Sequence, residues 1–324
     1  MLSATAVPAS LKGRDFLRVN DWAPDELVLA LDLAARLKAR QRERVPHRLL
    51  EGRTLGMIFQ KPSTRTRVSF EVGMFQLGGS ALQLGGSALQ LAAGDLQLGR
   101  GETIEDTAAV LSRYLDAIMI RTFAQSDVDE LAEHADVPVL NGLTDDFHPC
   151  QALADVLTIR ERFETLDDVR VAYLGDGNNV CHSLMVACGK LGASFVAATP
   201  PGYEPREDVV GWAEAAASDS GGSVALTEDP REAASGADVL YTDVWTSMGR
   251  DEERERRLRD LHGYTIDEAL LELGSERVIV MHCLPAHYGE EVTREILHGP
   301  RSAAWDQAEN RLHTQKALLA LVVR

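Results

Sequence analysis

The stretch TLGMIFQKPSTRTRVSFE, residues 54–71, joins an apolar run to a cluster of hydroxyl groups and arginines. Its first part, TLGMIF (54–59), is typical of a buried strand. Residues 64–77 favour a helix that ends at Gly78 and Gly79. A strand followed by a helix across a short polar turn begins a βαβ unit. The stretch therefore predicts a parallel sheet that carries polar groups at one edge.

The alternation of strand-like and helix-like segments continues along the chain. Further strands are expected at AIMIR (117–121), VPVLNG (137–142), VRVAYLG (169–175), SFVAAT (194–199), ADVLYTD (237–243) and RVIVMHC (277–283). Helices are expected around 150–163 and 181–191, and QAENRLHTQKALLALVV (307–323) reads as an amphipathic helix. This order predicts an α/β protein with two doubly wound domains, each built on a mainly parallel sheet flanked by helices.

The second half of the chain repeats the pattern of the first. A joint is therefore expected at the helix around 150–163, so that each half has its own sheet. We expect one domain at 1–150 and a second at 151–305. The last helix, about 306–324, is expected to pack back on the first domain.

The charge balance limits the possible partners. The 324 residues include 33 Lys plus Arg against 50 Asp plus Glu, a net charge of -17, which disfavours nucleic acid and anionic membrane surfaces. No apolar run approaches the ~18 residues of a membrane span. The first residues lack the basic segment and apolar core of a signal peptide. We expect a cytoplasmic protein with no nucleic-acid or membrane partner.

No cofactor is expected. The four cysteines form neither a CxxC pair nor a disulfide-like framework, and no spacing matches a zinc site, so no metal is predicted. The segment GDGNNV (175–180) resembles part of a dinucleotide fingerprint. However, Val180 occupies the third glycine position, and no Asp or Glu follows the next strand. NAD binding is therefore not expected.

The segment PSTRTR places Ser63 and Thr64 where a helix begins, with Arg65 and Arg67 behind them. Free N–H groups and the positive end of the helix dipole favour an anion at such a position. The alternative is that one hydroxyl caps the helix while the arginines lie in solvent. Capping accounts for one hydroxyl but not for the arginines, so the segment favours a site for phosphate or a similar anion. A nucleotide triphosphate is not implied, because GxxxxGK is absent.

Other polar side chains also follow strands. Arg121 ends the strand of MIRTF, where a surface salt bridge is the alternative to a ligand contact. In FHPCQ, His148 and Gln151 lie three residues apart at a strand-to-helix junction, although a lone histidine is more often structural. These residues extend the predicted anion site.

A second group suits a cation. Asp243 in TDVWTSMG ends a strand and is followed by Ser247 and a glycine turn. Cys283 in MHCLPAH ends another strand, where a buried and inert cysteine is the alternative. Taken together, the two groups predict a ligand set with a phosphate-like end and an ammonium end.

The motifs STRTR, MIRTF, HPCQ, GDGNN, DVWTSMG, HCLP and ENRLHTQKALL stand in the order found in one family. From about residue 14 to its end, the chain resembles the aspartate/ornithine carbamoyltransferases. STRTR and HPCQ mark the whole family, while DVWTSMG and HCLP resemble its ornithine-specific branch. The resemblance implies a carbamoyl-phosphate-binding domain at 1–150 and an ornithine-binding domain at 151–305.

The resemblance also implies a role for each matching residue. Carbamoyl phosphate would be bound by Ser63, Thr64, Arg65, Thr66, Gln97, Arg121, His148, Gln151, Cys283, Leu284 and Arg311. Ornithine would be bound by Asn179, Asp243, Ser247 and Met248. The residues expected to act in catalysis are Arg121, His148, Asp243 and Cys283.

The implied reaction is attack of the ornithine side-chain amine on carbamoyl phosphate, which gives citrulline and phosphate. One alternative is a carbamoyltransferase for putrescine or N-acetylornithine, although SMG after Asp243 suits an unmodified α-amino group. Another is a non-catalytic, anion-sensing homologue. Such a homologue would be expected to lack one or more of the motif residues, and all of them are present.

The resemblance implies a homotrimer or a multiple of trimers. Gln97, in GDLQLGRGE, would reach the phosphate site of a neighbouring subunit. Before it, QLGGSALQLGGSALQL (76–91) contains a tandem repeat of seven residues. Absorbing seven residues inside a strand would reverse the facing of later side chains. We therefore expect one SALQL to form a strand and the other to loop out.

Overall fold

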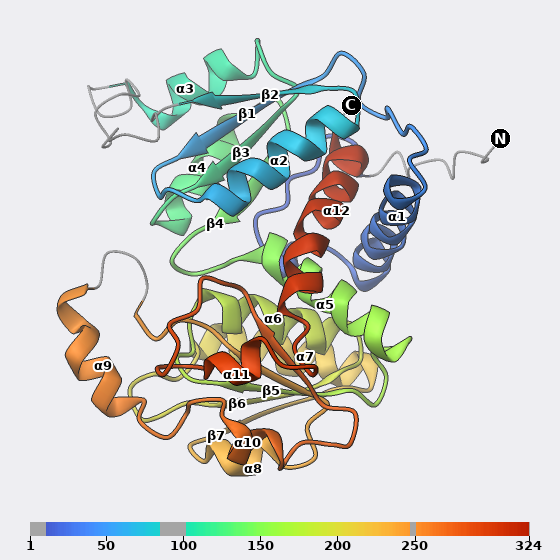
Figure 1. The fold of residues 1–324 in the computed structure, drawn as a ribbon. Helices are drawn as coiled ribbons and strands as arrows, with labels where there is room; N and C mark the ends of the chain where they lie inside the picture. The colour runs from blue at the N-terminus through green and yellow to red at the C-terminus, as the bar shows by residue number, and fades with distance from the viewer. Residues whose placement is uncertain (1–10, 85–101, 247–250, 324) are drawn as a thin grey trace. The chain divides into compact units, whose positions relative to one another are not determined.

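The computed structural model describes residues 11–84, 102–246 and 251–323 (Figure 1). The chain divides into two compact units. The first contains Met1–Cys150 together with Arg311–Arg324, and the second contains Gln151–Asn310. Two continuous helices, α5 and α12, run across the boundaries between them.

The first unit is built on a sheet of four strands in the order β2-β1-β3-β4, and every neighbouring pair is parallel. Its strands are β1 (Thr54–Phe59), β2 (Ser80–Leu84), β3 (Ala117–Arg121) and β4 (Val139–Leu143). Its helices are α1 (Pro24–Arg42), α2 (Thr64–Gln76), α3 (Ile104–Leu111) and α4 (Gln125–His134), with α5 (Pro149–Phe163) starting and α12 (Ala304–Val322) ending in it.

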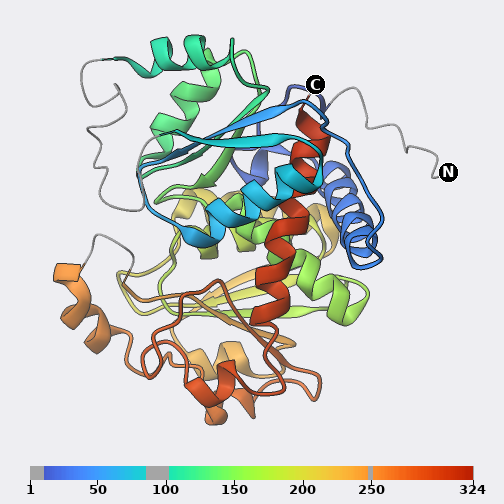
Figure 2. The same cartoon turned by 45° about the horizontal axis from the view of Figure 1, so that its top comes forward.

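Helices cover both faces of this sheet, with α2 on one face and α3 and α4 on the other (Figures 1 and 2). Strand β3 is buried along its whole length, as expected for a central strand with two covered faces. Ile118 and Ile120 pack with Leu131 and Val128 of α4 in one apolar cluster. Burial of each such side chain contributes roughly 1.5–3 kcal/mol to folding. The sheet is therefore a firm support for groups at its edge.

The second unit contains a five-stranded parallel sheet in the order β7-β6-β5-β8-β9. Its strands are β5 (Arg170–Leu174), β6 (Ser194–Ala198), β7 (Ser223–Thr227), β8 (Val239–Thr242) and β9 (Ile279–His282). Besides parts of α5 and α12, its helices are α6 (Asn179–Lys190), α7 (Glu207–Ser220), α8 (Pro230–Ala234), α9 (Arg254–Asp260), α10 (Glu268–Leu271) and α11 (Arg294–Leu297).

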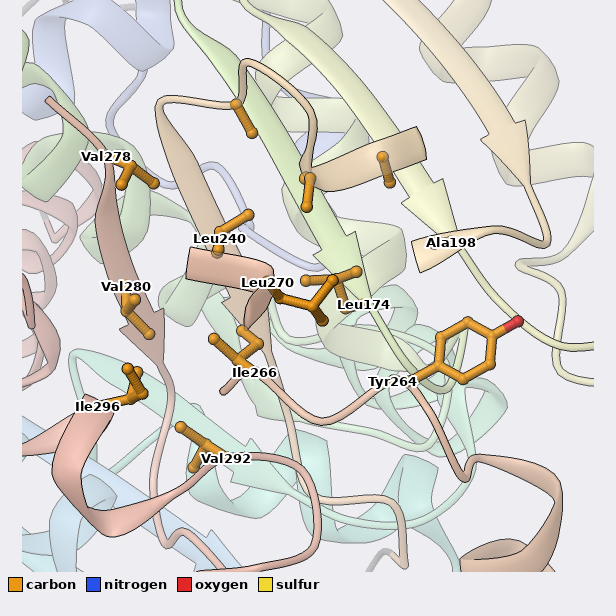
Figure 3. Close-up of a cluster of buried hydrophobic side chains, with 14 of the residues drawn as sticks. Leu174, Ala198, Leu240, Tyr264, Ile266, Leu270, Val278, Val280, Val292 and Ile296 are labelled. Atoms are coloured by element: carbon orange, nitrogen blue, oxygen red, sulfur yellow. The ribbon is translucent and has the colours of Figure 1, made fainter. Parts of the chain in front are cut away.

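Alternate side chains of the central strands pack against opposite helix layers. Figure 3 shows Leu174, Leu240 and Val280, from three adjacent strands, in the cluster that also contains Leu270 of α10 and Ile296 of α11. The intervening side chains point to the opposite face of the sheet. The two-sided burial explains why these strands read as continuous apolar runs in the sequence.

The predicted α/β class with two doubly wound parallel sheets is confirmed. One strand was not predicted: β7 lies at the edge of its sheet, and three of its five residues are exposed, so it lacks an apolar run. The amphipathic reading of the last helix is wrong for its final part, because residues 313–323 are all buried. Polar side chains there, including His313 and Lys316, lie inside the first unit.

The first SALQL copy of the repeat forms β2, Ser80–Leu84. The second copy lies outside the described residues. Among the described helices, none combines the length and the apolar character required to cross a bilayer.

Candidate active site

The predicted site residues follow the carboxyl ends of adjacent strands in each unit. In the first unit, β1 pairs with β2 on one side and β3 on the other, so the chain changes winding direction between β1 and β3. Ser63 follows β1 and Arg121 ends β3. In doubly wound sheets ligands bind outside the strand ends at such a switch point. The topology thus places the STRTR segment and Arg121 where a ligand is expected.

Ser63 caps helix α2. Its Oγ accepts a hydrogen bond from the Thr66 backbone N–H at 3.2 Å and donates to Thr66 Oγ1 at 3.0 Å. The capping alternative is therefore correct for Ser63. Other N–H groups of the first turn and the positive end of the dipole remain directed toward the same edge. Thr64 and Arg65, the first two residues of the helix, are exposed there.

Thr66 connects this helix to Arg311 of α12. The Arg311 guanidinium donates to Thr66 Oγ1 at 3.1 Å, and both side chains are buried. Gln315 lies one turn further along α12. With its amide oxygen toward Arg311, it accepts from that guanidinium at 3.1 and 3.3 Å and donates to Ser69 at 2.6 Å. Arg311 is thus fixed in place by its own helix and by α2.

His148 is surrounded by positive charge. The side chain is 4 % exposed. Its pKa is held well below the usual histidine range by burial first, and then by the charges of Arg311, Arg121 and Arg65. The imidazole is therefore neutral near pH 7, and the arginines supply the positive charge. A neutral histidine near these arginines can contact an anion without adding a further charge beside the buried Arg121 and Arg311.

The two arginines of STRTR have different environments. Arg67 lies 3.3 Å from Glu71, one helical turn away, so it has an acidic partner within its own helix. Lys61, also near the end of β1, pairs with Asp145 and lies 4.4 Å from the centre of the Phe123 ring. Arg65 is exposed, and its charge contributes to the lowered pKa of His148.

In the second unit the winding direction changes between β5 and β8, which are neighbours in the sheet. Asn178 follows β5 and caps α6, where its Oδ1 accepts from the N–H groups of Val180 and Cys181. Its Nδ2 donates to Asp243 Oδ2, just after β8, at 2.8 Å. A single asparagine therefore connects the two loops of the switch point.

Asp243 also accepts a hydrogen bond from the Cys283 thiol, with 2.8 Å between Sγ and Oδ1. Asp243 is buried and Cys283 is half-buried after β9. Cys283 is therefore not fully buried, unlike the cysteine of the alternative interpretation. A carboxylate and a thiol at one strand edge suit recognition of an amine.

The turn after Cys283 has a fixed shape. Leu284 has a φ of 59°, which is uncommon for a residue with a branched side chain. Its N–H donates to His282 Nδ1 at 2.8 Å. The other ring nitrogen, Nε2, lies 3.1 Å from Oε1 of the buried Glu291. His282 therefore holds the Leu284 backbone through Nδ1 and carries its proton on Nε2.

Two clusters of described residues have enough nearby ligand atoms for a metal ion: Asp243 with His282 and Cys283, and His287 with Glu290 and Glu291. In the first cluster both ring nitrogens of His282 already make hydrogen bonds. A metal would have to displace Leu284 or Glu291 from that ring. The absence of a metal requirement stays a prediction.

The structure gathers the candidate residues into two groups. The first unit contains Ser63, Thr64, Arg65, Thr66, Arg121, His148 and Arg311, and the second contains Gln151, Asn179, Asp243, Cys283 and Leu284. Asn179 is half-buried as the first residue of α6. Gln97, Ser247 and Met248 lie outside the described residues.

Two contacts in these groups were not predicted. Asn178, rather than its neighbour, is bonded to Asp243, and Gln315 supports Arg311. The first could have been found from its position as an asparagine N-cap directly after a strand. Gln315 has a weaker signal, its spacing of four residues from Arg311 on one helix face.

Arginines and helix amides at one strand edge suit an anion, and a carboxylate and a thiol at the other suit an amine, the pair of sites that a transferase from a phosphorylated donor to an amine requires. Family models agree: "Aspartate/ornithine carbamoyltransferase, carbamoyl-P binding domain" matches residues 14–161, and "Aspartate/ornithine carbamoyltransferase, Asp/Orn binding domain" matches residues 167–322. The chain belongs to the aspartate/ornithine carbamoyltransferase family.

Similar proteins are named as ornithine carbamoyltransferases. The enzyme of Pyrococcus horikoshii is 56% identical over 314 residues, 97% of each chain. The Pyrococcus furiosus protein, named "Ornithine carbamoyltransferase, anabolic", is 56% identical over 97% of this chain and 98% of its own. A solved structure of ornithine carbamoyltransferase from Pyrococcus furiosus matches with a TM-score of 0.92 and 56% identity, over 97% of this chain and 98% of that one.

Proposed function

We propose that the chain transfers the carbamoyl group of carbamoyl phosphate to the side-chain amine of L-ornithine, giving L-citrulline and phosphate. The observation that carries this proposal is the pair of switch-point sites in a chain 56% identical to ornithine carbamoyltransferases. One site has the charge for a phosphate, and the other has the carboxylate and thiol for an amine.

The phosphate of the donor binds at the start of α2. Ser63, Thr64, Arg65 and Thr66 supply hydroxyl, backbone and guanidinium groups, and Gln97 of a neighbouring subunit completes the set. As the bond to phosphate breaks, negative charge grows on the leaving group. The helix end and Arg311 stabilise that charge without rearrangement, because the helix N–H groups and the Arg311 guanidinium are held in place before the reaction.

The carbonyl oxygen becomes an oxyanion when the amine attacks. Thr66, Arg121 and His148 surround the carbamoyl group and donate to this oxygen, and a donor of this kind is worth roughly 3–4 kcal/mol. Thr66 Oγ1 already accepts from Arg311, which orients its own hydroxyl hydrogen away from that guanidinium. Catalysis then depends on positioning and electrostatics, and no covalent intermediate is needed.

The second unit binds ornithine. Asn179, Asp243, Ser247 and Met248 hold the amino-acid end. Cys283 donates a hydrogen bond to Asp243, which fixes the direction of that carboxylate. The site for carbamoyl phosphate is therefore positively charged, and the site for ornithine contains a carboxylate. These charges are opposite to those of the phosphate and the amine that bind there.

The deciding experiment is an assay of citrulline with purified protein. Carbamoyl phosphate is supplied with ornithine, putrescine or N-acetylornithine in parallel, after dialysis against a chelator. We expect turnover with ornithine and no loss on chelation. Activity with putrescine or N-acetylornithine alone would replace ornithine with that amine. Absence of turnover with all three, alongside tight binding of carbamoyl phosphate, would favour an anion-sensing homologue.

The working form is proposed to be a homotrimer or a multiple of it. Val68, Val72 and Phe75 form an exposed apolar stripe along α2, and Leu82 is exposed on the edge strand β2. Phe75 is 81% exposed. An apolar patch of this kind marks an interaction site, and an identical subunit is the partner in most soluble oligomers.

Light scattering should give a mass about three times the 35.4 kDa of one chain, or a multiple of that. Phe75→Asp should lower the mass. Tyr114→Asp is the matched control, since Tyr114 is an aromatic residue that is 73% exposed elsewhere in the first unit. An unchanged mass in Phe75→Asp would place the interface on another surface.

We propose a cytoplasmic, biosynthetic role, with citrulline made toward arginine. The relative named anabolic supports the direction. The test is rescue of arginine-free growth in a bacterial strain that lacks its own ornithine carbamoyltransferase. Failure of a well-expressed and active chain to restore growth would favour a catabolic role.

A further inference from the structure

The second unit contains a fully buried carboxylate, Asp155. Asp155, on α5, is 0% exposed. Gln151 Nε2 and Gln307 Nε2 donate to its Oδ1 at 2.8 and 2.7 Å, and the Tyr241 hydroxyl donates to its Oδ2 at 3.1 Å. These partners come from three elements, α5, β8 and α12. A buried carboxylate is costly unless donors surround it, and this one has them.

The carboxylate fixes which end of the Gln151 amide faces it. An ionised carboxylate only accepts hydrogen bonds, so the NH2 of Gln151 must point to Asp155. The amide oxygen, Oε1, must then point away from Asp155. Without Asp155 the amide could rotate by half a turn and present its NH2 instead. Asp155 therefore leaves the Gln151 Oε1 atom, a hydrogen-bond acceptor, directed away from the carboxylate.

The same carboxylate orients Gln307. Because the Gln307 NH2 donates to Asp155 and to the Tyr241 hydroxyl at 3.0 Å, its oxygen faces the opposite way. There it accepts the backbone N–H of His282 at 2.9 Å. His282 precedes Cys283, so the end of β9 is tied to the same buried group.

We propose that Asp155 is a positioning residue that selects the carbamoyl NH2 through Gln151, an inference that rests on the proposed function. The carbamoyl group differs from an acetyl group in carrying an NH2, which is a donor. A glutamine oxygen held toward it accepts from that NH2, whereas a rotated amide would place two donors face to face. Asp155 touches no substrate and acts only through the orientation of this side chain.

The test compares two ligands that differ at one group. Phosphonoacetamide has the carbamoyl NH2, with a methylene in place of the bridging oxygen, and 2-oxopropylphosphonate has a methyl group in place of the NH2. The wild-type chain should bind the amide more tightly, measured by calorimetry or by competition with carbamoyl phosphate. In Asp155→Ala this preference should fall about tenfold, the worth of roughly one hydrogen bond.

Two further variants separate orientation from general loosening. Tyr241→Phe removes the hydroxyl donor from Oδ2 but leaves both glutamine contacts, so it should keep the preference. Asp155→Asn retains an oxygen acceptor for the two glutamines and can donate to Tyr241. This variant should therefore keep most of the wild-type preference for phosphonoacetamide. Equal weakening of both ligands in Asp155→Ala, or an Asp155→Asn variant as impaired as Asp155→Ala, would overturn the inference.

A crystal structure of the wild-type chain with phosphonoacetamide tests the same idea if Asp155→Ala does not fold. Gln151 Nε2 should remain on Asp155, with Oε1 on the ligand nitrogen. A ligand nitrogen without Gln151 Oε1 as partner would overturn the inference. The wild-type assay is done first. No citrulline from the wild-type chain would overturn the proposed function and this inference together, whereas an unaltered preference in folded Asp155→Ala would overturn the inference alone.

Discussion

The thiol of Cys283 donates a hydrogen bond to a carboxylate oxygen of Asp243, with 2.8 Å between Sγ and Oδ1. The second carboxylate oxygen accepts from Asn178 at 2.8 Å. Each oxygen therefore has one fixed partner, and these partners come from the loops after β5 and β9, on either side of β8. An amine that approaches Asp243 meets a carboxylate whose plane is already set.

Asp243→Asn should impair recognition of ornithine and leave donor binding intact. The substitution keeps the shape but removes the charge, and a hydrogen bond to a charged group is worth about 1.5–3 kcal/mol. We expect KM for ornithine to rise about 10- to 100-fold. Calorimetry with phosphonoacetamide serves as the internal control and should show unchanged affinity. A normal KM for ornithine would remove Asp243 from the amino-acid site.

Arg65→Ala should weaken binding of phosphate and carbamoyl phosphate by about 10- to 100-fold, because a charge-assisted contact to the anion is lost. Arg67→Ala is the matched control: it removes an arginine from the same helix, but one that lies 3.3 Å from Glu71. Its phosphate affinity should stay near that of the wild type. Calorimetry with inorganic phosphate measures both variants, and equal losses would show that net charge, rather than position, matters.

The value of kcat/KM for ornithine should rise from neutral to mildly alkaline pH. The attacking amine resembles that of lysine, with a free pKa of about 10.4, so its reactive fraction grows up to about tenfold per pH unit below that value. No inflection from His148 is expected near pH 6.5, because burial and the three neighbouring arginines hold its pKa well below that range. A flat profile from pH 7 to 9 would show that another step limits the rate.

His313 should make the fold sensitive to acid. Burial first, and then Lys316, Lys38, Arg42 and His47, lower its pKa to about 3. An unfolded histidine binds its proton below about pH 6.5. Between pH 6.5 and about pH 3 the unfolded chain therefore holds more protons than the folded chain, and the free energy of unfolding decreases as the pH is lowered. This single group should remove about 2 kcal/mol of unfolding free energy between pH 6.5 and 5.

His313→Gln should therefore lose less stability than the wild type over that interval in urea unfolding. Protein concentration is held constant, because assembly contributes to stability. The exposed His298→Gln is the control for the substitution itself. The same loss in His313→Gln as in the wild type would assign the acid sensitivity to other groups.

Mixed subunits should regain activity if Gln97 acts in a neighbour's site. Arg65→Ala and Gln97→Ala are each first shown to be impaired, then dissociated and reassembled in equal amounts. With random mixing in a cyclic trimer, roughly a quarter of sites combine an intact Arg65 with an intact neighbouring Gln97. The assay is citrulline formation, with subunit exchange followed by mass. Exchange without any recovered activity would place Gln97 outside the shared site.

The sequence by itself determined the architecture. The apolar runs at 54–59 and 117–121 correspond to β1 and β3, because strands buried on both faces must be continuously apolar. The polar residues after them could be assigned to a ligand edge, because parallel strands end at the same side of a sheet. Two edge strands, β2 and β7, whose residues are exposed or half-buried, lack this signal. The family resemblance added the substrate classes and the matching residues.

Only the tertiary structure decided which side chains meet. Neighbouring asparagines at 178 and 179 look alike in the sequence, but the start of α6 turns Asn178 toward Asp243. Arg65 and Arg67 are likewise similar by composition, yet the charge of Arg65 lowers the pKa of His148, while Arg67 lies 3.3 Å from Glu71. Asp155 reads as an ordinary helix residue until Tyr241 and Gln307, both more than 80 positions away, are seen to bond to it. Such contacts depend on which side chains are buried and where they point. Both are set only when segments that are distant in the sequence pack together in the folded chain.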